Sequence, residues 1–319
     1  MKLISRLSTL FLLLVAAGAG TGPEAPEAPT VPTTPPVILD GIKYTDLEQQ
    51  GALTRETCRR LHIPTIPIAY HGGVDTNADG TITEANIENF TEWTDRTVAR
   101  NWSLPAVLDY EQPWWDELTA RSIEPDRLQE ILQVYLEGLA VAQQLRPDAQ
   151  WGYWGLPAMR HVSPKWLGQG VSIDSLLQAQ DAEYPAAYDC NPDGDASEFK
   201  RYVERVLERT AGRRPVWVFI NTRYCGQDGD RTLFIPVDVM LANAEAILSA
   251  TWVDGDGTEH RAAGLVVWDT YGWSDEDQWG ELDRRNADLF NRLHSLAGAM
   301  RTPDEASDQS GSEPPPRSP

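Results

Sequence analysis

The chain has 319 residues, of which 41% are hydrophobic, and it contains 12 Trp and 10 Tyr. This is enough apolar material to bury one large core or two modest ones. The formal net charge of −21 at pH 7 disfavours binding of nucleic acid or of an anionic membrane, and it also counts against a polyanionic substrate.

The first 19 residues read as a secretory signal peptide. Lys2 and Arg6 form a basic start, residues 10–17 are an apolar run, and the small residues 17–19 offer a cleavage site. No cysteine follows the apolar run, which disfavours a lipoprotein anchor, and no later segment approaches the ~20 apolar residues of a spanning helix. We therefore expect a secreted or periplasmic protein, with no membrane insertion after signal cleavage.

Both ends of the remaining chain have the composition of unfolded segments. Residues 20–36 are Pro-rich and should form an extended linker. Residues 301–319 end in a run of Ser, Gly and Pro and should be a disordered tail. The folded domain is therefore expected over residues 37–300.

Apolar runs that resemble strands recur along this domain, at residues 66–73, 105–111, 151–157, 183–190, 215–223 and 264–272. Apolar residues at helical spacing predict helices at 125–144, 197–211, 237–251 and 284–300. The alternation, with strands that read as buried on both faces, favours a parallel α/β fold. Polar chemistry at the carboxyl ends of the strands favours a TIM-type (β/α) barrel. A doubly wound open sheet fits the periodicity equally well, but no GxGxxG follows the first strand.

A loop with calcium-ligand spacing follows the first of these strands, at residues 75–86 (DTNADGTITEAN). Positions 1, 3, 5 and 7 of an EF-hand-type loop are filled by Asp75, Asn77, Asp79 and Thr81. Position 12 is Asn86 and not the usual bidentate Glu. The loop is either a structural calcium site or an Asx-rich turn that binds no ion.

Two carboxyl groups follow the next strand, in the segment AVLDYEQPWW (106–115). Residues two apart on a strand face the same side, so Asp109 and Glu111 point together and Tyr110 points away. Two close carboxylates cannot both ionise freely, and one pKa should rise, as glycosidic bond cleavage requires of its acid. Alternatively, the pair caps the following helix or binds an Arg.

Aromatic residues recur at the other strand ends, at Tyr70, Trp151, Tyr153, Trp154, Tyr184, Tyr188, Trp268 and Tyr271. Sugar rings stack on aromatic rings, so a cleft lined in this way suits a saccharide. The candidate substrate-binding residues are Tyr153, Trp154, Tyr184, Tyr188 and Trp268.

Several segments resemble the hyaluronidase family of glycoside hydrolases. AVLDYEQPWW is similar to the Asp-x-Glu strand of that family, and WGYWGLP resembles its Trp-Gly-aromatic-Tyr-Gly-Phe-Pro segment. EYPAAY resembles its Tyr-Pro-Ser-x-Tyr, and GLVVWDTYG its Gly-Val-Val-x-Trp strand. The segments occur in the family's order over roughly residues 60–295. The resemblance implies a barrel hydrolase that requires no cofactor for catalysis.

By this resemblance, Glu111 is the general acid/base and Asp109 orients the N-acetyl group of the substrate, whose carbonyl oxygen acts as the nucleophile. Tyr188 and Trp268 line the site that holds this sugar. Two positions depart from the family pattern: Trp154 replaces a tyrosine, and Ala158 replaces an aspartate. The departures, together with the negative charge, favour a saccharide other than hyaluronan.

The sequence thus predicts a hydrolase of an N-acetylhexosamine-containing polysaccharide. Two other functions fit parts of it: an inactive barrel that binds a saccharide, and a calcium-dependent adhesion or scaffold module built around residues 75–86. Of the three cysteines, Cys190 and Cys225 follow sequential strands and should come within disulfide range. Cys58, on a helix before the first strand, should be free.

Overall fold

The computed structural model describes residues 37–225 and 233–300. The predicted signal peptide (1–19), linker (20–36) and tail (301–319) lie outside these residues, and they stay predictions. No helix in the described ranges is long and apolar enough to cross a membrane.

Six short strands with parallel neighbours are described: β1 (Ile38–Asp40), β2 (Ile68–Ala69), β3 (Pro105–Leu108), β4 (Gln150–Tyr153), β5 (Trp217–Asn221) and β8 (Gly264–Trp268). They form two three-stranded sheets with the orders β1-β8-β5 and β2-β3-β4. Val107 of β3 lies opposite Gly152 of β4, and Asn221 of β5 lies opposite Trp268 of β8. The predicted parallel α/β class is therefore confirmed.

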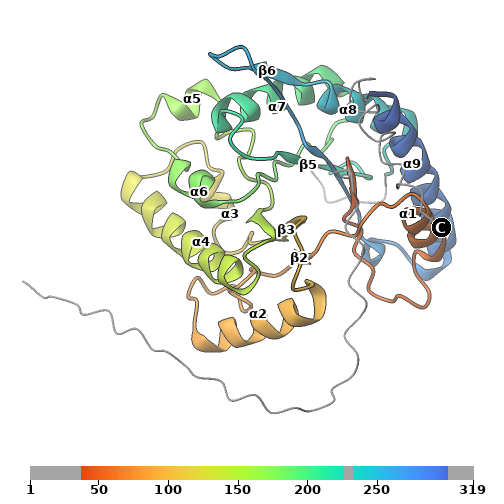
Figure 1. The fold of residues 1–319 in the computed structure, drawn as a ribbon, viewed down its shortest axis with the longest axis horizontal. Helices are drawn as coiled ribbons and strands as arrows, with labels where there is room; N and C mark the ends of the chain where they lie inside the picture. Colours follow the sequence, from red (N-terminus) through yellow and green to blue (C-terminus); the bar gives the residue numbers. More distant parts are fainter. Residues whose placement is uncertain (1–36, 226–232, 301–319) are drawn as a thin grey trace, which may run out of the picture. The chain divides into compact units, whose positions relative to one another are not determined.

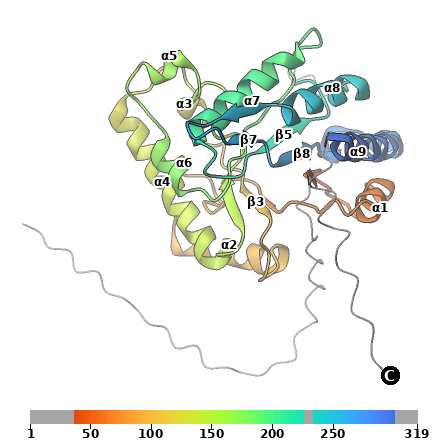
Figure 2. The same ribbon diagram turned by 45° about the horizontal axis from the view of Figure 1, so that its top comes forward.

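Helices fill the connections and lie around the strands in both ribbon views (Figures 1 and 2). In chain order they are α1 (Ala52–Arg60), α2 (Glu84–Thr97), α3 (Trp115–Leu118), α4 (Pro125–Leu145), α5 (Pro164–Leu167), α6 (Asp174–Ala179), α7 (Ala196–Thr210), α8 (Val237–Leu248) and α9 (Trp279–Met300). Helix α4 shows how the sequence produces them. Pro125 occupies its first turn, where no amide partner is needed, and Leu128, Ile131 and Leu139 form its buried face.

Single parallel bridges, and not continuous ladders, connect the two sheets. On one side Asp40 of β1 is bridged to Thr65, three residues before β2. On the other side, isolated bridges join residues 183–186 to Trp154, Val216 and Phe219. The predicted strand at 183–190 is not continuous, because Pro185 has no N–H to donate to a ladder. The predicted barrel is thus observed as two bridged sheets without a closed ladder of strands.

Side chains along the strands alternate between two packed environments. Val107 packs into a cluster drawn from both sheets, whereas its neighbours Ala106 and Leu108 pack on the helix side. The shared cluster consists of Leu39, Ile66, Ile68, Val107, Ala182, Tyr184, Trp217, Phe219 and Val266. Burial on both faces explains why these strands read as uninterrupted apolar runs.

The helix predicted for residues 237–251 is three residues too long. Helix α8 ends at Leu248, and β6 (Thr251–Val253) pairs antiparallel with β7 (Glu259–Arg261). The β-branched and aromatic residues of β6 favour a strand over a helix. The Asp-Gly-Asp-Gly segment at 254–257 forms the turn between the two strands.

Candidate active site

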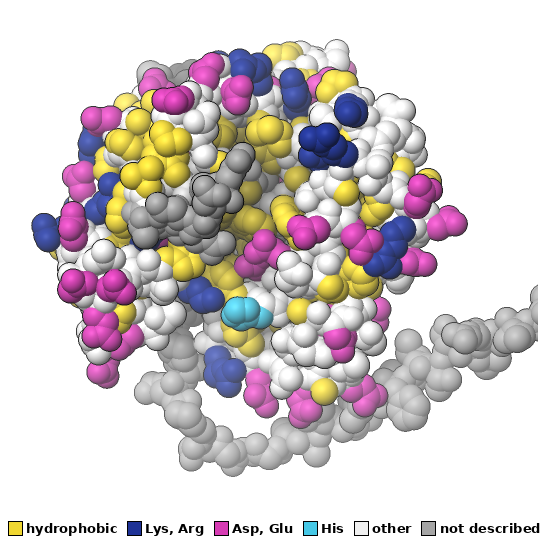
Figure 3. Space-filling model, turned by 180° about the vertical axis from the view of Figure 1, so that it is seen from behind, with side chains coloured by type: hydrophobic (Ala, Val, Ile, Leu, Met, Phe, Trp, Pro, Cys, Tyr) yellow, Lys and Arg dark blue, Asp and Glu magenta, His cyan; other side chains and the backbone are white. Residues whose placement is uncertain are grey.

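Polar and aromatic side chains gather where the parallel strands end. They line a pocket of about 240 Å³, formed by Ile68, Tyr70, Asp109, Glu111, Trp154, Tyr188, Phe219, Asn221, Thr222, Arg223, Tyr224, Cys225, Trp268, Asp269 and Trp273. A hollow with hydrophobic walls and acidic side chains beside it is visible on the face shown in Figure 3. Folds with parallel sheets commonly build their sites at this end of the strands.

Asp109 and Glu111 directly follow β3, and both line the pocket. Tyr110 between them is buried, and its hydroxyl donates to Asp75 on the opposite side, at 2.6 Å. This is the alternation expected at the end of a strand. Glu111 is exposed and Asp109 is half-buried. The pocket therefore receives two carboxyl groups with unequal access to water.

Burial gives Asp109 an unusual protonation behaviour. The pKa of this carboxyl is raised from 3.8 to about 7, mainly by burial and further by the neighbouring Glu111, while Lys43 lowers it. Asp109 Oδ1 has no hydrogen-bond partner in the described part of the chain. A raised pKa within the pair was expected, and it belongs to the more buried member. Near neutral pH, this carboxyl can therefore donate or accept a hydrogen bond.

Three of the predicted substrate-binding residues, Trp154, Tyr188 and Trp268, line the pocket. The ring centroids of Trp154 and Tyr188 are 5.7 Å apart, and those of Tyr188 and Trp268 are 6.0 Å apart. Trp115 and Trp273 extend this series at its two ends, 5.2 Å from Trp154 and 5.0 Å from Trp268. The five rings, termed the aromatic row below, follow one another as neighbours, and the four that line the pocket (Trp154, Tyr188, Trp268 and Trp273) can contact sugar faces.

The other two predicted substrate-binding residues lie in the core. Tyr153 is 2% exposed, and its hydroxyl donates to the carbonyl oxygen of Tyr135 at 2.7 Å. Tyr184 is fully buried, and its hydroxyl donates to the carbonyl oxygen of Gln150 at the start of β4. Neither residue lines the pocket, so the structure places both in packing and backbone hydrogen bonding.

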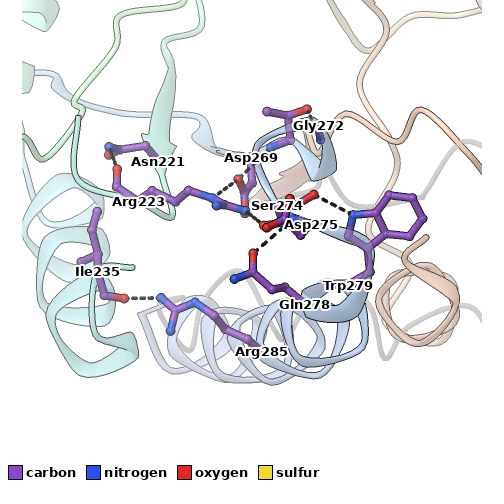
Figure 4. Close-up of polar contacts among 11 residues, drawn as sticks. Asn221, Arg223, Ile235, Asp269, Gly272, Ser274, Asp275, Gln278, Trp279 and Arg285 are labelled. Carbon is purple, nitrogen blue, oxygen red and sulfur yellow. Dashed lines mark hydrogen bonds and ion pairs between the residues drawn. The ribbon is translucent and has the colours of Figure 1, made fainter. Parts of the chain in front are cut away.

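A buried ion pair forms one side of the pocket (Figure 4). Arg223 Nε donates to Asp269 Oδ1 at 2.8 Å, and the two side chains are only 3% and 1% exposed. Burial raises the pKa of Asp269, whereas Arg223 lowers it. Arg223 Nη2 also donates to Ser274 Oγ at 2.8 Å. Arg223 thereby ties the end of β5 to the segment that carries Trp273.

The sequence did not identify Arg223, Asp269 or Trp273, which line the pocket, or Trp115, which packs against Trp154 outside its lining. Arg223 and Asp269 do carry a signal in the sequence, because they are polar residues that follow β5 and β8 as Asp109 follows β3. Their selection required knowing that these strand ends meet around one pocket. The two Trp residues lie several positions beyond their strands, where strand spacing makes no prediction.

The predicted disulfide between Cys190 and Cys225 is present, with a Cα–Cα distance of 4.4 Å. Cys225 lines the pocket, so the bond lies at its wall. Asn221 supports the same region, because its Nδ2 donates to the carbonyl oxygen of Asp189 at 3.1 Å. Cys58 in α1 is free and buried, also as predicted.

The loop at 75–86 forms a hydrogen-bonded turn. Asn77 Nδ2 donates to Asp79 Oδ2 at 2.7 Å, and the Thr81 N–H donates to Asp79 Oδ1 at 2.9 Å. Asn86 pairs with Thr83 in a capping box at the start of α2. Within residues 37–225 and 233–300, no three His, Cys, Asp or Glu side chains are grouped to hold a metal. Carboxylates could therefore supply only some of the oxygen ligands that a calcium ion needs. Calcium binding by this loop stays a prediction.

Comparisons with known proteins agree with this architecture. No family model and no curated protein matches the chain. A crystal structure of bee venom hyaluronidase is similar to it with a TM-score of 0.60 and 16% identity, over 81% of this chain and 99% of that one. The same bee enzyme in complex with a hyaluronic acid tetramer is similar with a TM-score of 0.55 and 15% identity, over 82% and 99%. The resemblance to hyaluronidases is thus confirmed for the fold.

Proposed function

We propose that this chain, with its hyaluronidase-like fold, is an exported glycoside hydrolase that cleaves an N-acetylhexosamine-containing polysaccharide. The observation that carries the proposal is the placement of Asp109 and Glu111 in one pocket beside the aromatic row. The disulfide supports export, because such bonds persist in oxidising compartments. A complete (β/α) barrel, closed through the bridges between the sheets, belongs to the same proposal.

In the proposed reaction, the acetamido carbonyl oxygen of the substrate attacks the anomeric carbon as the glycosidic bond breaks. Glu111 donates its proton to the leaving oxygen and then takes a proton from the water that opens the cyclic intermediate. Its exposure leaves it accessible to a leaving saccharide. Asp109 accepts a hydrogen bond from the acetamido N–H, which gains positive charge during the attack. In the pocket without substrate, burial favours the protonated form of Asp109. The positive charge that develops on the acetamido group favours the ionised form during the attack.

The pocket also argues for a substrate other than hyaluronan. Trp154 takes the place of the family's tyrosine, and its indole N–H donates to the Tyr188 hydroxyl at 3.2 Å. Ala158, at the position of the family's aspartate, is not part of the pocket lining. A neutral N-acetylhexosamine polymer avoids the repulsion that a polyanion would meet at a chain of net charge −21.

Substrates matched in all but the N-acetyl group test this proposal. Oligosaccharides of N-acetylhexosamine should be cleaved, and the same oligosaccharides without the acetyl group should be resistant, because they lack the nucleophile. Equal cleavage of both would contradict the substrate-assisted route. Binding of the acetylated oligosaccharides without any cleavage would favour the alternative of an inactive saccharide-binding protein, which the replaced tyrosine and aspartate make worth testing.

A further inference from the structure

The loop at residues 75–86 has no part in the proposed reaction, yet it contains an unusual carboxylate. Asp75 is fully buried, and its Oδ2 accepts hydrogen bonds from the Gly80 N–H at 2.7 Å and the Tyr110 hydroxyl at 2.6 Å. The bond to Gly80 spans the loop, so the carboxylate points into it. The other oxygen, Oδ1, is buried without a hydrogen-bond partner in the described part of the chain. Buried carboxylate oxygens are normally satisfied by a donor or a cation.

Three other oxygen-bearing side chains of the loop are hydrogen-bonded to one another. Asn77 Nδ2 lies 2.7 Å from Asp79 Oδ2, and Asn86 Nδ2 lies 2.7 Å from Asn77 Oδ1. With Asp75, these side chains occupy positions 1, 3, 5 and 12 of a 12-residue loop. Two carboxylates with amide and main-chain oxygens form a donor set that suits Ca²⁺, which accepts all three kinds of oxygen.

We propose that this loop binds one calcium ion through Asp75, Asn77 and Asp79, with the main-chain carbonyl of Thr81, and that the ion fixes the end of strand β3. The Oδ1 atom of Asp75 then has a cation as its partner. The ion is structural and takes no part in bond cleavage.

Tyr110 connects the loop to the carboxyl pair. Its side chain donates to Asp75, and its main chain lies between Asp109 and Glu111. The Trp114 indole N–H donates to the Tyr110 hydroxyl at 3.0 Å. The same indole packs so closely on Gly80 that a Cβ there would lie 2.4 Å from it. A loop held by calcium therefore holds Tyr110, and with it the strand end that presents both carboxyl groups.

The position of Trp114 allows a direct binding experiment on the full chain. Terbium, which replaces calcium at oxygen sites, should show emission sensitised by Trp114, and added calcium should abolish that emission. Calcium alone should also raise the melting temperature relative to EDTA by about 5 °C, because it binds only the folded loop. Absence of sensitised emission together with superimposed melting curves would overturn the proposal.

Two variants separate a metal site from a metal-free turn. Asp75→Asn keeps an oxygen for Gly80 and Tyr110 but removes the charge, so it should abolish the calcium response while the protein still unfolds cooperatively in EDTA. Asp79→Ser changes an exposed residue and should weaken calcium binding by at least about tenfold. The matched control is Asp254→Asn in the β6–β7 turn, which should leave calcium binding unchanged. An unaltered calcium response in Asp75→Asn and Asp79→Ser would contradict the assignment.

Tyr110→Phe tests the connection to β3. The ring is kept, but Asp75 loses the hydroxyl that orients it, and loss of such a partner of a metal ligand typically weakens metal affinity by roughly 10–100-fold. Unchanged calcium affinity in this variant would remove the coupling between the loop and the carboxyl pair. These measurements do not depend on hydrolase activity, so they fail or succeed independently of the proposed function.

Discussion

Asp109 and Glu111 lie two residues apart on one strand end, yet their surroundings differ. Glu111 is exposed, as the proposed exchange of protons with a leaving saccharide and with water requires. Asp109 is withdrawn from water and has a raised pKa. The buried carboxyl is costly for the fold, and such a cost is typical of residues retained for function.

This cost predicts a pH-dependent effect of Asp109→Asn on stability. Well below pH 3.8 the carboxyl is protonated in both the folded and the unfolded chain, and no penalty arises. As the pH rises from 3.8 to about 7, the unfolded chain ionises while the folded chain keeps the proton, so the wild type loses stability. The variant should therefore melt at a higher temperature than the wild type at pH 8, with a much smaller difference near pH 4.

Thermal unfolding at the two pH values measures this effect. Asp256→Asn, at an exposed position, serves as the control and should show no such pH-dependent gain. A variant that is less stable than the wild type at pH 8 would show that Asp109 is held by interactions that favour its ionised form.

Strand spacing located the carboxyl pair but could not sort the aromatic residues. Tyr153 is on the helix side of β4, whereas the next residue, Trp154, is on the pocket side. Tyr184 packs in the same cluster as Trp154 but lies farther from the pocket, because its hydroxyl reaches the carbonyl oxygen of the first residue of β4. Alternation along a strand predicts which face of the sheet a side chain lies on. How close that side chain comes to the pocket depends on the register between neighbouring strands, which cannot be read from a single sequence.

Among the elements, the sequence predicted that the long amphipathic helices exist, but it predicted less accurately the residues at which they begin and end. The predicted helix at 284–300 begins earlier, at Trp279, directly after a 3₁₀ turn (Glu276–Gln278) that Asp275 and Gln278 cap. Strand β1 was missed because it has only three residues, at Ile38–Asp40. Short strands are stabilised by their neighbours in the sheet and leave little periodicity to detect.

The disulfide restrains the long segment between the bridged residues 183–186 and the end of β5. It closes a loop with a sequence separation of 35, so removing it through Cys190→Ser and Cys225→Ser should cost about 3–4 kcal/mol of unfolding free energy. Because Cys225 lines the pocket, substrate affinity should fall as well. Denaturant unfolding gives the first quantity and KM the second. A reductant should destabilise the wild type but leave the double variant unchanged, and equal stability of the two proteins would contradict this role.

At the scale of the whole molecule, the charge of −21 makes a prediction about salt. Repulsion between the protein and an anionic polysaccharide is screened as salt is added, whereas a neutral polymer is unaffected. Any activity on hyaluronan should therefore increase between about 50 and 500 mM salt, over which screening becomes strong. Activity on neutral N-acetylhexosamine oligosaccharides should stay nearly constant. A fall in hyaluronan cleavage over this range would indicate a basic binding surface and contradict the argument from charge.

The whole-molecule similarity to bee venom hyaluronidase is one of fold, at 15–16% identity. The sequence motifs pointed to this fold because several chemistry-bearing segments resemble those of the hyaluronidase family and occur in its order. They could not show which residues line the pocket. Residues such as Arg223 and Trp273 meet there only after the chain has folded.

The central claim is that Glu111 is the acid/base of a hydrolase, and the variant Glu111→Gln tests it most directly. The amide keeps the shape of the side chain but cannot supply the proton, and general acid/base catalysis is typically worth about 10²–10⁴-fold in rate. Turnover of a responsive N-acetylhexosamine oligosaccharide should fall by at least that lower factor, with an unchanged melting temperature. Glu137→Gln, exposed on α4, should retain wild-type turnover. If Glu111→Gln also retains near-full turnover, the proton donor lies elsewhere and the proposed mechanism is wrong.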